Sequence, residues 1–382
     1  MKQHKILFVD HTAVMGGAEL CLRDLAVAYS QDSKVLLFQN GLLKDHLIKA
    51  GVRVKIAPAS TRMLNLRTSG GLNSLATAPE LWNLAGHIAQ EAQGYDLILA
   101  NSQKAFVTAA LSRLKNSPPV CWYLHDILTA QHFSSLNRRL AVFLANRFAS
   151  KVLVNSEATG QAFVAAGGNA KLLDVVYNGF ESQKFDDVSD QEVEAVRLSL
   201  GIGDAPLVGL FSRLSYWKGQ HILLSAIKNL PNVHVVLVGE ALFGEKEYVE
   251  ELKAIADAPE LAGRVHWLGF RNDIPTLMKA CNIIVHTSTE PEPFGRVIVE
   301  GQLAQKPVIA SAAGGALELI EDGVNGYLVP TGDAQALSQR IAQLISDRAS
   351  ATSIAQEGYN NAKANFALTT ILQSFDRALA MV

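Results

Sequence analysis

The sequence predicts an α/β protein built from two doubly wound, Rossmann-like domains whose parallel sheets face an interdomain cleft. Short, almost wholly apolar runs recur along the 382 residues, and a helix-length amphipathic segment follows each of them. Such continuous runs are typical of parallel strands covered by helices on both faces. The composition changes after Asn178-Gly179, where an acidic and polar stretch separates two series of these units. A chain of this length can bury two cores of ordinary size.

The expected elements follow directly from these runs. The strands of the first series are expected at 5–10, 34–39, 52–57, 97–101, 120–125, 152–156 and 175–178. Those of the second series are expected at 207–211, 234–239, 265–269, 283–286, 307–311 and 326–329. We therefore expect a first domain over residues 1–185, with the linker beginning at Asp186, and a second domain over 186–367. A C-terminal helix within 368–382 is expected to pack across the domains.

Composition restricts the class of protein and its compartment. The formal net charge of -2 argues against nucleic-acid binding, which normally requires a basic excess. The three cysteines share no short spacing and resemble small buried hydrophobes. The apolar run near residue 5 is too short for a signal peptide, and no run approaches the ~18 residues of a membrane-spanning helix. We expect a cytoplasmic protein, at most peripheral to a membrane.

The segment Glu290 to Glu300 combines the features of a ligand site. Its prolines disfavour helix before Phe294, so backbone amides near Phe294 and Gly295 should point outward at a helix start and attract anions. Glu292 precedes this start, and Glu300 lies roughly 9 to 12 Å along the helix. Carboxylates accept hydrogen bonds from hydroxyls, whereas a pyrophosphate needs amides and cations. A sugar nucleotide offers both groups.

Arg213 and Lys218 lie on one loop after the first strand of the second series. A guanidinium and an ammonium there either bind a diphosphate leaving group or pair with surface acids. The chain contains no D-x-D motif, the usual acidic pair that holds a divalent ion on a diphosphate. We therefore expect fixed cations and helix dipoles to replace a metal, and we expect no cofactor.

Other loops after strands carry weaker motifs. Gly16 and Gly17 either let the backbone approach a ligand or form a plain turn. His125 either holds a substrate group or lies under a loop. Gly239 and Glu240 end one strand. The next strand leads into Phe270, Arg271 and Ile274, which either seat a nucleotide base or precede a capped helix.

In their order and spacing, these motifs resemble the retaining glycosyltransferases of family 4, which have the GT-B fold. The resemblance covers nearly the whole chain. It is strongest from Leu207 to Val329, through SRLSYWKG, VGE, LGF, EPEPFGRVIVEG, SAAGG and DGVNGYLV. The N-terminal half matches mainly through GGAE, the His125-Asp126 pair and YNGFE. The family often has a glycine where this chain has Pro293.

The resemblance implies a role for each motif. Arg213 and Lys218 would neutralise the donor diphosphate, Glu292 would hold hydroxyls of the transferred sugar, and Glu300 would bind the ribose. His125 would contact the sugar near the reacting carbon. The implied catalytic residues are Arg213, Lys218, Glu292 and His125. The implied donor-binding residues are Gly16, Gly17, Gly239, Glu240, Phe270, Arg271, Ile274, Pro293, Phe294, Gly295, Arg296, Val297 and Glu300.

The resemblance further implies transfer of a hexose from a nucleotide sugar, with UDP-glucose favoured over GDP-mannose, to a glycan or lipid-linked acceptor in polysaccharide synthesis. The partners would be these two substrates. A nucleotide-sugar epimerase or isomerase and a non-catalytic sugar-nucleotide-binding subunit stay as alternatives.

The basic, amphipathic segment 137–151 either touches the anionic inner face of a membrane or packs on its own sheet. Residues 60–79 are expected to form an acceptor-side loop or a mobile segment. The sequence leaves the oligomeric state open.

Overall fold

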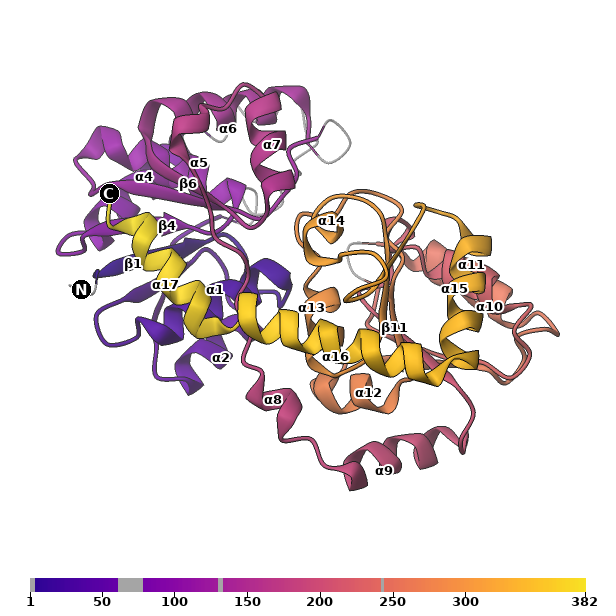
Figure 1. Ribbon diagram of the computed structural model, residues 1–382. Coiled ribbons are helices and arrows are strands. Elements are labelled where there is room, and N and C mark those ends of the chain that lie inside the picture. The colour runs from indigo at the N-terminus through magenta and orange to yellow at the C-terminus, as the bar shows by residue number, and fades with distance from the viewer. Residues whose placement is uncertain (1–3, 61–77, 130–132, 242–243) are drawn as a thin grey trace. The chain divides into compact units, whose positions relative to one another are not determined.

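The computed structural model describes residues 4–60, 78–129, 133–241 and 244–382, and divides the chain into two compact units. The N-terminal unit contains Met1–Gly179 and Ile371–Val382, and the C-terminal unit contains Phe180–Thr370. Each unit is a parallel sheet with covering helices (Figure 1). This confirms the predicted fold class. Most of the segment 60–79, expected to lie beside the acceptor, falls outside the described residues.

The sheet of the N-terminal unit has the strand order β3-β2-β1-β4-β5-β6-β7. Its strands are β1 (Ile6–Asp10), β2 (Lys34–Leu37), β3 (Arg53–Ile56), β4 (Leu97–Ala100), β5 (Val120–Leu124), β6 (Ala149–Val154) and β7 (Leu173–Val175). The seven strands correspond to the expected runs, although β6 and β7 begin earlier than predicted. Strand β1 has Ile6 and Phe8 in one buried cluster and Leu7 and Val9 in another, so both faces of the sheet are covered. Burial on two faces explains the unbroken apolar runs.

The helices of this unit include α1 (Gly17–Ala28), α2 (Leu42–Lys49), α4 (Ala78–Glu91), α5 (Gln103–Ser112), α6 (Ser135–Phe148) and α7 (Glu157–Ala165), with 3-10 turns at Arg113–Lys115 and Ala170–Leu172. The C-terminal helix α17 (Leu368–Leu379) buries Ile371, Phe375 and Leu379 in the cluster of Ile6 and Phe8. Its spacing of apolar residues thus fits the core of the N-terminal unit. Among the described residues, no helix combines the length and apolarity needed to cross a membrane.

The sheet of the C-terminal unit has the strand order β10-β9-β8-β11-β12-β13. Its strands are β8 (Leu207–Phe211), β9 (His234–Val238), β10 (Val265–Gly269), β11 (Ile283–His286), β12 (Val308–Ser311) and β13 (Tyr327–Val329). Its helices include α8 (Gln183–Asp186), α9 (Asp190–Leu200), α10 (Gln220–Ile227), α11 (Lys246–Ala256), α12 (Ile274–Ala280), α13 (Arg296–Leu303), α14 (Ala316–Leu319), α15 (Ala334–Ser346) and α16 (Arg348–Asn365), with a 3-10 turn η4 at Tyr216–Lys218.

The chain enters the C-terminal unit earlier than the sequence indicated. Phe180 stacks near Phe294 with ring centroids 6.3 Å apart, and its N–H donates to the carbonyl of Phe366 at 2.9 Å. The units therefore divide at Gly179 and Phe180, not at residues 185 and 186. The acidic stretch that we expected to be a linker forms helix α9, which Ser189 and Glu192 begin with a capping box. Its polar composition reflects exposure, because α9 has no fully buried residue.

Both sheets have a point where the strand order reverses. In the N-terminal unit this point lies between β1 and β4, and in the C-terminal unit between β8 and β11. Ligands of open parallel sheets bind outside the carboxyl ends of the strands at such points. The residues that follow β1, β4, β8 and β11 are therefore the first to examine for a site.

Candidate functional site in each unit

The cluster in the C-terminal unit is centred on Glu292, which lies between β11 and α13 and is only 6% exposed. One carboxylate oxygen, Oε1, forms an ion pair with Lys218 Nζ and accepts a hydrogen bond from Ser288 Oγ at 2.6 Å. The other oxygen, Oε2, lies 3.1 Å from His286 Nε2. Both oxygens of the predicted sugar ligand Glu292 thus have protein partners.

The partners of Glu292 determine its charge state. Burial by itself would raise the pKa of the carboxyl group, but the charges of Lys218 and His286 and their hydrogen bonds outweigh burial. The pKa of Glu292 consequently lies well below its ordinary value. A small pocket beside it is lined by Ser212, Lys218, His286, Ser288, Glu292 and Val297, among other residues. This pocket places Lys218, Glu292 and Val297 together.

The loop after β8 brings the two predicted cations together. The guanidinium carbon of Arg213 lies 5.6 Å from the centre of the Trp217 ring, and Lys218 Nζ lies 4.0 Å from the same centre. The loop also needs glycine at position 219, because a Cβ there would lie 2.0 Å from the Thr287 carbonyl oxygen. This close approach joins the loop to the end of β11. The two cations therefore belong to the same edge of the sheet as Glu292.

Helix α13 begins just after Phe294 and Gly295, near which the sequence predicted its start. Gly295 is its N-cap, with φ of 95°, and the helix starts at Arg296. The side chain of Phe294 is buried and packs near Phe180 and Phe366, so it supports the loop. Pro293 precedes it in the same loop. The Nε of Arg296 lies 3.4 Å from Glu300 Oε1, which places a cation next to the predicted ribose ligand.

The loops after β9 and β10 contact each other. The Gly239 N–H donates to the carbonyl of Gly269 at 2.8 Å, and the Phe270 N–H donates to Glu240 Oε1 at 3.3 Å. Arg271, predicted to frame a base, makes a two-point contact with Asp273, at 2.8 Å and 2.5 Å. The Phe270 ring is 51% exposed. Ile274 opens helix α12 just beyond.

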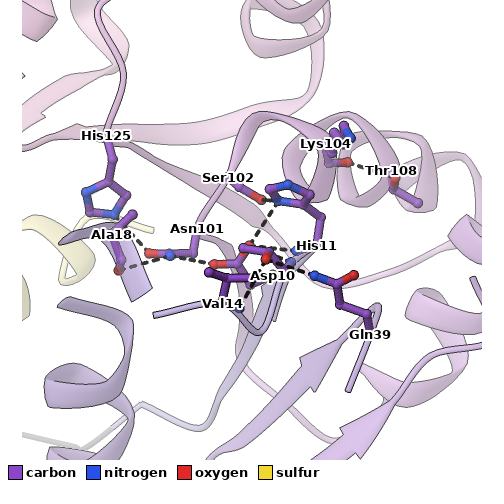
Figure 2. A network of polar contacts seen from close by, with 11 residues as sticks. Asp10, His11, Val14, Ala18, Gln39, Asn101, Ser102, Lys104, Thr108 and His125 are labelled. Carbon is purple, nitrogen blue, oxygen red and sulfur yellow. Dashed lines mark hydrogen bonds and ion pairs between the residues drawn. The ribbon is translucent and has the colours of Figure 1, made fainter. Parts of the chain in front are cut away.

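The N-terminal unit has a polar network at the ends of β1 and β4, drawn in Figure 2. Asn101 Nδ2 donates to Asp10 Oδ2 at 2.7 Å, and Asn101 Oδ1 lies 2.9 Å from His125 Nε2. A second branch runs from Asp10 to His11, whose Nδ1 lies 2.7 Å from Ser102 Oγ. Asp10 is fully buried, yet the hydrogen bonds and charge of His11, with the Asn101 amide, outweigh burial and lower its pKa.

Gly16 and Gly17 stand at the start of helix α1, with Gly16 as the N-cap. The carboxylate of Glu19 folds back over Gly16, where a Cβ would lie 2.6 Å from Glu19 Oε2. The glycine at position 16 therefore leaves room for Glu19. Burial, together with the nearby Asp10 and Asp126 carboxylates, raises the pKa of Glu19 to about 8.

Sequence reasoning found Lys218, Glu292 and His125 but missed several of the residues that contact them. His286 and Ser288 hold the carboxylate of Glu292, and Asp10 and Asn101 connect to His125. These four residues share one property that the sequence does show. Each ends, or closely follows, an apolar strand beside a point where the strand order reverses.

Two doubly wound units, each with a polar cluster at the carboxyl edge of its sheet, define the GT-B class of glycosyltransferase fold. Residues 193–361 match the family model for glycosyl transferases group 1, and residues 16–179 match the model for a glycosyl transferase 4-like domain. The chain belongs to the glycosyl transferases group 1. This family membership confirms the resemblance of the motifs.

Solved structures and curated proteins agree with this assignment. The chain is similar to Anabaena HepE, solved in complex with UDP and glucose, at 44% identity and a TM-score of 0.91, covering 99% of this chain and 100% of that one. The fold is also that of a sucrose-phosphate synthase from Thermosynechococcus elongatus, at 20% identity and a TM-score of 0.82, covering 98% of each chain. A lipopolysaccharide core glycosyltransferase, LpsE of Rhizobium meliloti, is 30% identical over 46% of this chain and 50% of its own length. The chain spans about half the length of the curated relatives it matches.

Proposed function

We propose that the protein is a retaining hexosyltransferase that uses a UDP-glucose type of donor and no metal ion. The observation that carries this proposal is the cluster of Arg213, Lys218 and Glu292 at the carboxyl edge of the C-terminal sheet. It offers cations for a diphosphate and a carboxylate for sugar hydroxyls within one edge of the sheet. Support for the donor comes from Anabaena HepE, which has been solved with UDP-glucose and is 44% identical to this chain.

Lys218 and Arg213 would act on the leaving group. Breaking the bond between the sugar and the diphosphate leaves negative charge on a phosphate oxygen, and fixed cations stabilise that charge most in a site with little water. Lys218 Nζ is already close to the Trp217 ring and the Glu292 carboxylate. Binding of a donor would let Lys218 exchange the carboxylate for a phosphate oxygen. Glu292 would then accept hydrogen bonds from sugar hydroxyls.

The contacts of Glu292 favour attack on the same face of the sugar that the diphosphate leaves. A nucleophilic carboxylate needs an unengaged oxygen beneath the anomeric carbon, as in retaining glycosidases. Glu292 instead keeps Ser288 on one oxygen and His286 on the other after Lys218 turns to the phosphate, and in our proposal it holds sugar hydroxyls. In our proposal the leaving phosphate oxygen takes the proton of the acceptor hydroxyl as the new glycosidic bond forms.

The acceptor would be a glycan or a lipid-linked glycan of an envelope or secreted polysaccharide. The name of the R. meliloti relative places that protein in lipopolysaccharide core biosynthesis.

A surface of the N-terminal unit also suits a lipid-linked acceptor. On helix α6, Leu136, Leu140 and Phe143 are 58%, 45% and 63% exposed, although Ala141 and Ala145 are buried. The helix contains Arg138, Arg139 and Arg147 and no acidic residue. An anionic bilayer complements both the apolar residues and the charge.

Vesicle binding tests the membrane part of the proposal. Sedimentation with vesicles containing anionic lipid should capture the protein, and uncharged vesicles should capture less. Phe143→Ser should lower binding to the anionic vesicles, because Phe143 is exposed and its loss removes apolar area from the surface. The matched control is Leu198→Ser, which alters an exposed leucine on helix α9. Sedimentation at background with both kinds of vesicle would contradict membrane contact.

A panel of sugar nucleotides tests the transferase itself. UDP-glucose should raise the melting temperature and be hydrolysed slowly to UDP without an acceptor, because ligands stabilise the state they bind. GDP-mannose should do neither if the donor is UDP-glucose. The anomeric configuration of the transferred sugar, read by proton NMR, should match that of the donor. Inversion of the configuration would contradict the retaining mechanism, and turnover to an isomeric nucleotide sugar would indicate an epimerase.

A further inference from the structure

The network in the N-terminal unit fixes the orientation of one side-chain amide. Asn101 Nδ2 lies 2.7 Å from Asp10 Oδ2 and 3.2 Å from the carbonyl oxygen of Ala18. A carboxylate and a carbonyl only accept hydrogen bonds, so the atom that faces them must be the NH₂ nitrogen. The amide oxygen of Asn101 therefore faces His125 (Figure 2).

This orientation determines which nitrogen of His125 carries a proton. Asn101 Oδ1 lies 2.9 Å from His125 Nε2, and an amide oxygen cannot donate. Nε2 must therefore be protonated, and in the neutral ring the lone pair lies on Nδ1. Asp10, together with the Ala18 carbonyl, thus selects the tautomer of His125 through Asn101.

The ring is also held from its face. The centre of the Tyr123 ring lies 4.2 Å from that of His125, and Tyr123 Oη donates to the carbonyl of Val176 at 2.7 Å. The Tyr123 hydroxyl is thus anchored by a hydrogen bond, and its ring lies against His125 at an interplanar angle of 37°. His125 is buried, with 8% of its surface exposed.

We propose that Asp10 and Asn101 are positioning residues of the transferase, which keep neutral His125 in the Nε2–H form and present Nδ1 as the ring atom able to accept a hydrogen bond. The proposal rests on the proposed function for the role of His125 beside the sugar. There, Nδ1 would accept from a hydroxyl of the donor sugar or of the acceptor. Loss of either positioning residue would leave the ring in a mixture of tautomers.

Asp10→Asn offers a sharp test because it should populate the other tautomer. The new amide keeps its oxygen toward the backbone N–H of His11, which lies 2.6 Å from Asp10 Oδ1. Its NH₂ group then faces the NH₂ group of Asn101, and two donors oppose each other. Turning the Asn101 amide relieves this conflict and directs NH₂ at His125, but it also sets the amide oxygen against the Ala18 carbonyl, which now accepts from Asn101 Nδ2 at 3.2 Å. The two orientations therefore compete, and in the turned one the ring carries its lone pair on Nε2 and its proton on Nδ1.

The measurement is a two-bond proton–nitrogen correlation spectrum of the full chain labelled with ¹⁵N-histidine, at about pH 8, where an ordinary imidazole is neutral. The spectrum of His125→Gln assigns the His125 signals. We expect an Nε2–H ring in the wild type and a mixture with a substantial Nδ1–H population in Asp10→Asn. Ser102→Ala is the matched control, because Ser102 Oγ contacts His11 Nδ1, on the branch of the network that leads away from His125. It should leave His125 in the Nε2–H form.

An Nδ1–H or doubly protonated His125 ring in the wild type would overturn the proposal. This outcome needs only the wild-type protein, so it does not depend on the folding of a variant. A folded Asp10→Asn protein with an unchanged ring would overturn the role of Asp10.

In donor hydrolysis, Asn101→Ala should lower kcat about 10-fold or more while KM for the donor changes about 2-fold or less. A changed KM with an unchanged kcat would contradict positioning. If no sugar nucleotide is hydrolysed, the proposed function fails, but the tautomer result still stands.

Discussion

The two units have polar clusters at equivalent points of the same fold, yet they compensate a buried carboxylate in different ways. Beside β1 and β4, Asp10 is held by the amide of Asn101 and by His11. Beside β8 and β11, Glu292 is held by the cation of Lys218, with His286 and Ser288. Lys218 can exchange the carboxylate for a ligand that brings its own charge, whereas the neutral amide of Asn101 offers no such exchange. We infer that the C-terminal cluster binds the donor and that the N-terminal cluster orients His125.

The largest effect should follow from removing a cation of the C-terminal cluster. Lys218→Ala or Arg213→Ala should lower transfer about 100-fold or more, the scale of losing one electrostatic stabiliser of the transition state. Initial rates at saturating donor provide the measurement. Lys253→Ala is a matched control, because Lys253 forms only an exposed pair with Glu250 at 3.0 Å. Unchanged rates for both cluster variants would remove the contrast between the two units.

The next effect concerns acid stability. The folded pKa of Glu292 is depressed, so its contribution to stability is present above the ordinary value of 4.5 and is lost as pH falls below it. Between pH 7 and about pH 3, the wild type should lose more unfolding free energy than Glu292→Gln, by about 1.4 kcal/mol or more, the free energy of one pKa unit. Urea titrations at the two pH values measure this. Equal losses in the two proteins would show that the ion pair does not determine the charge of Glu292.

The smallest effect has the opposite sign and belongs to the N-terminal unit. The pKa of Glu19 is raised to about 8, so the stability associated with its neutral form is present below 4.5 and lost as pH rises toward 8. Glu19→Gln should therefore unfold at higher urea concentration than the wild type at about pH 9, by about 1 kcal/mol or more, a value set below the full shift because Glu19 is partly exposed to solvent. At about pH 4 the two proteins should be alike, which serves as the internal control. A stabilisation that is equal at both pH values would contradict the raised pKa.

The fold was predictable because its main determinant is local. Burial of both faces makes each strand an unbroken apolar run, and the expected runs correspond to strands in both sheets. The unit boundary was less predictable. Phe180 belongs to the C-terminal unit because it packs near Phe294 and Phe366, and neither contact is visible in the residues around position 180.

The candidate site was predictable only in part. Charged residues in loops are conspicuous, so Arg213, Lys218 and Glu292 could be selected from their positions after strands. The partners that set their chemistry are distant in sequence. Asn101 lies 91 residues from Asp10, and Glu292 lies 74 residues from Lys218. Only the strand order of each sheet brings these pairs together, and strand order cannot be derived from apolar runs alone.

The most direct test is a crystal structure of the protein with UDP-glucose. Our account predicts the diphosphate within hydrogen-bond distance of Arg213 and Lys218, with Lys218 Nζ moved from Glu292 to a phosphate oxygen and a sugar hydroxyl bonded to Glu292. A donor bound elsewhere would contradict the account, as would phosphates bound while Lys218 keeps its pair with Glu292 and Arg213 points away from them.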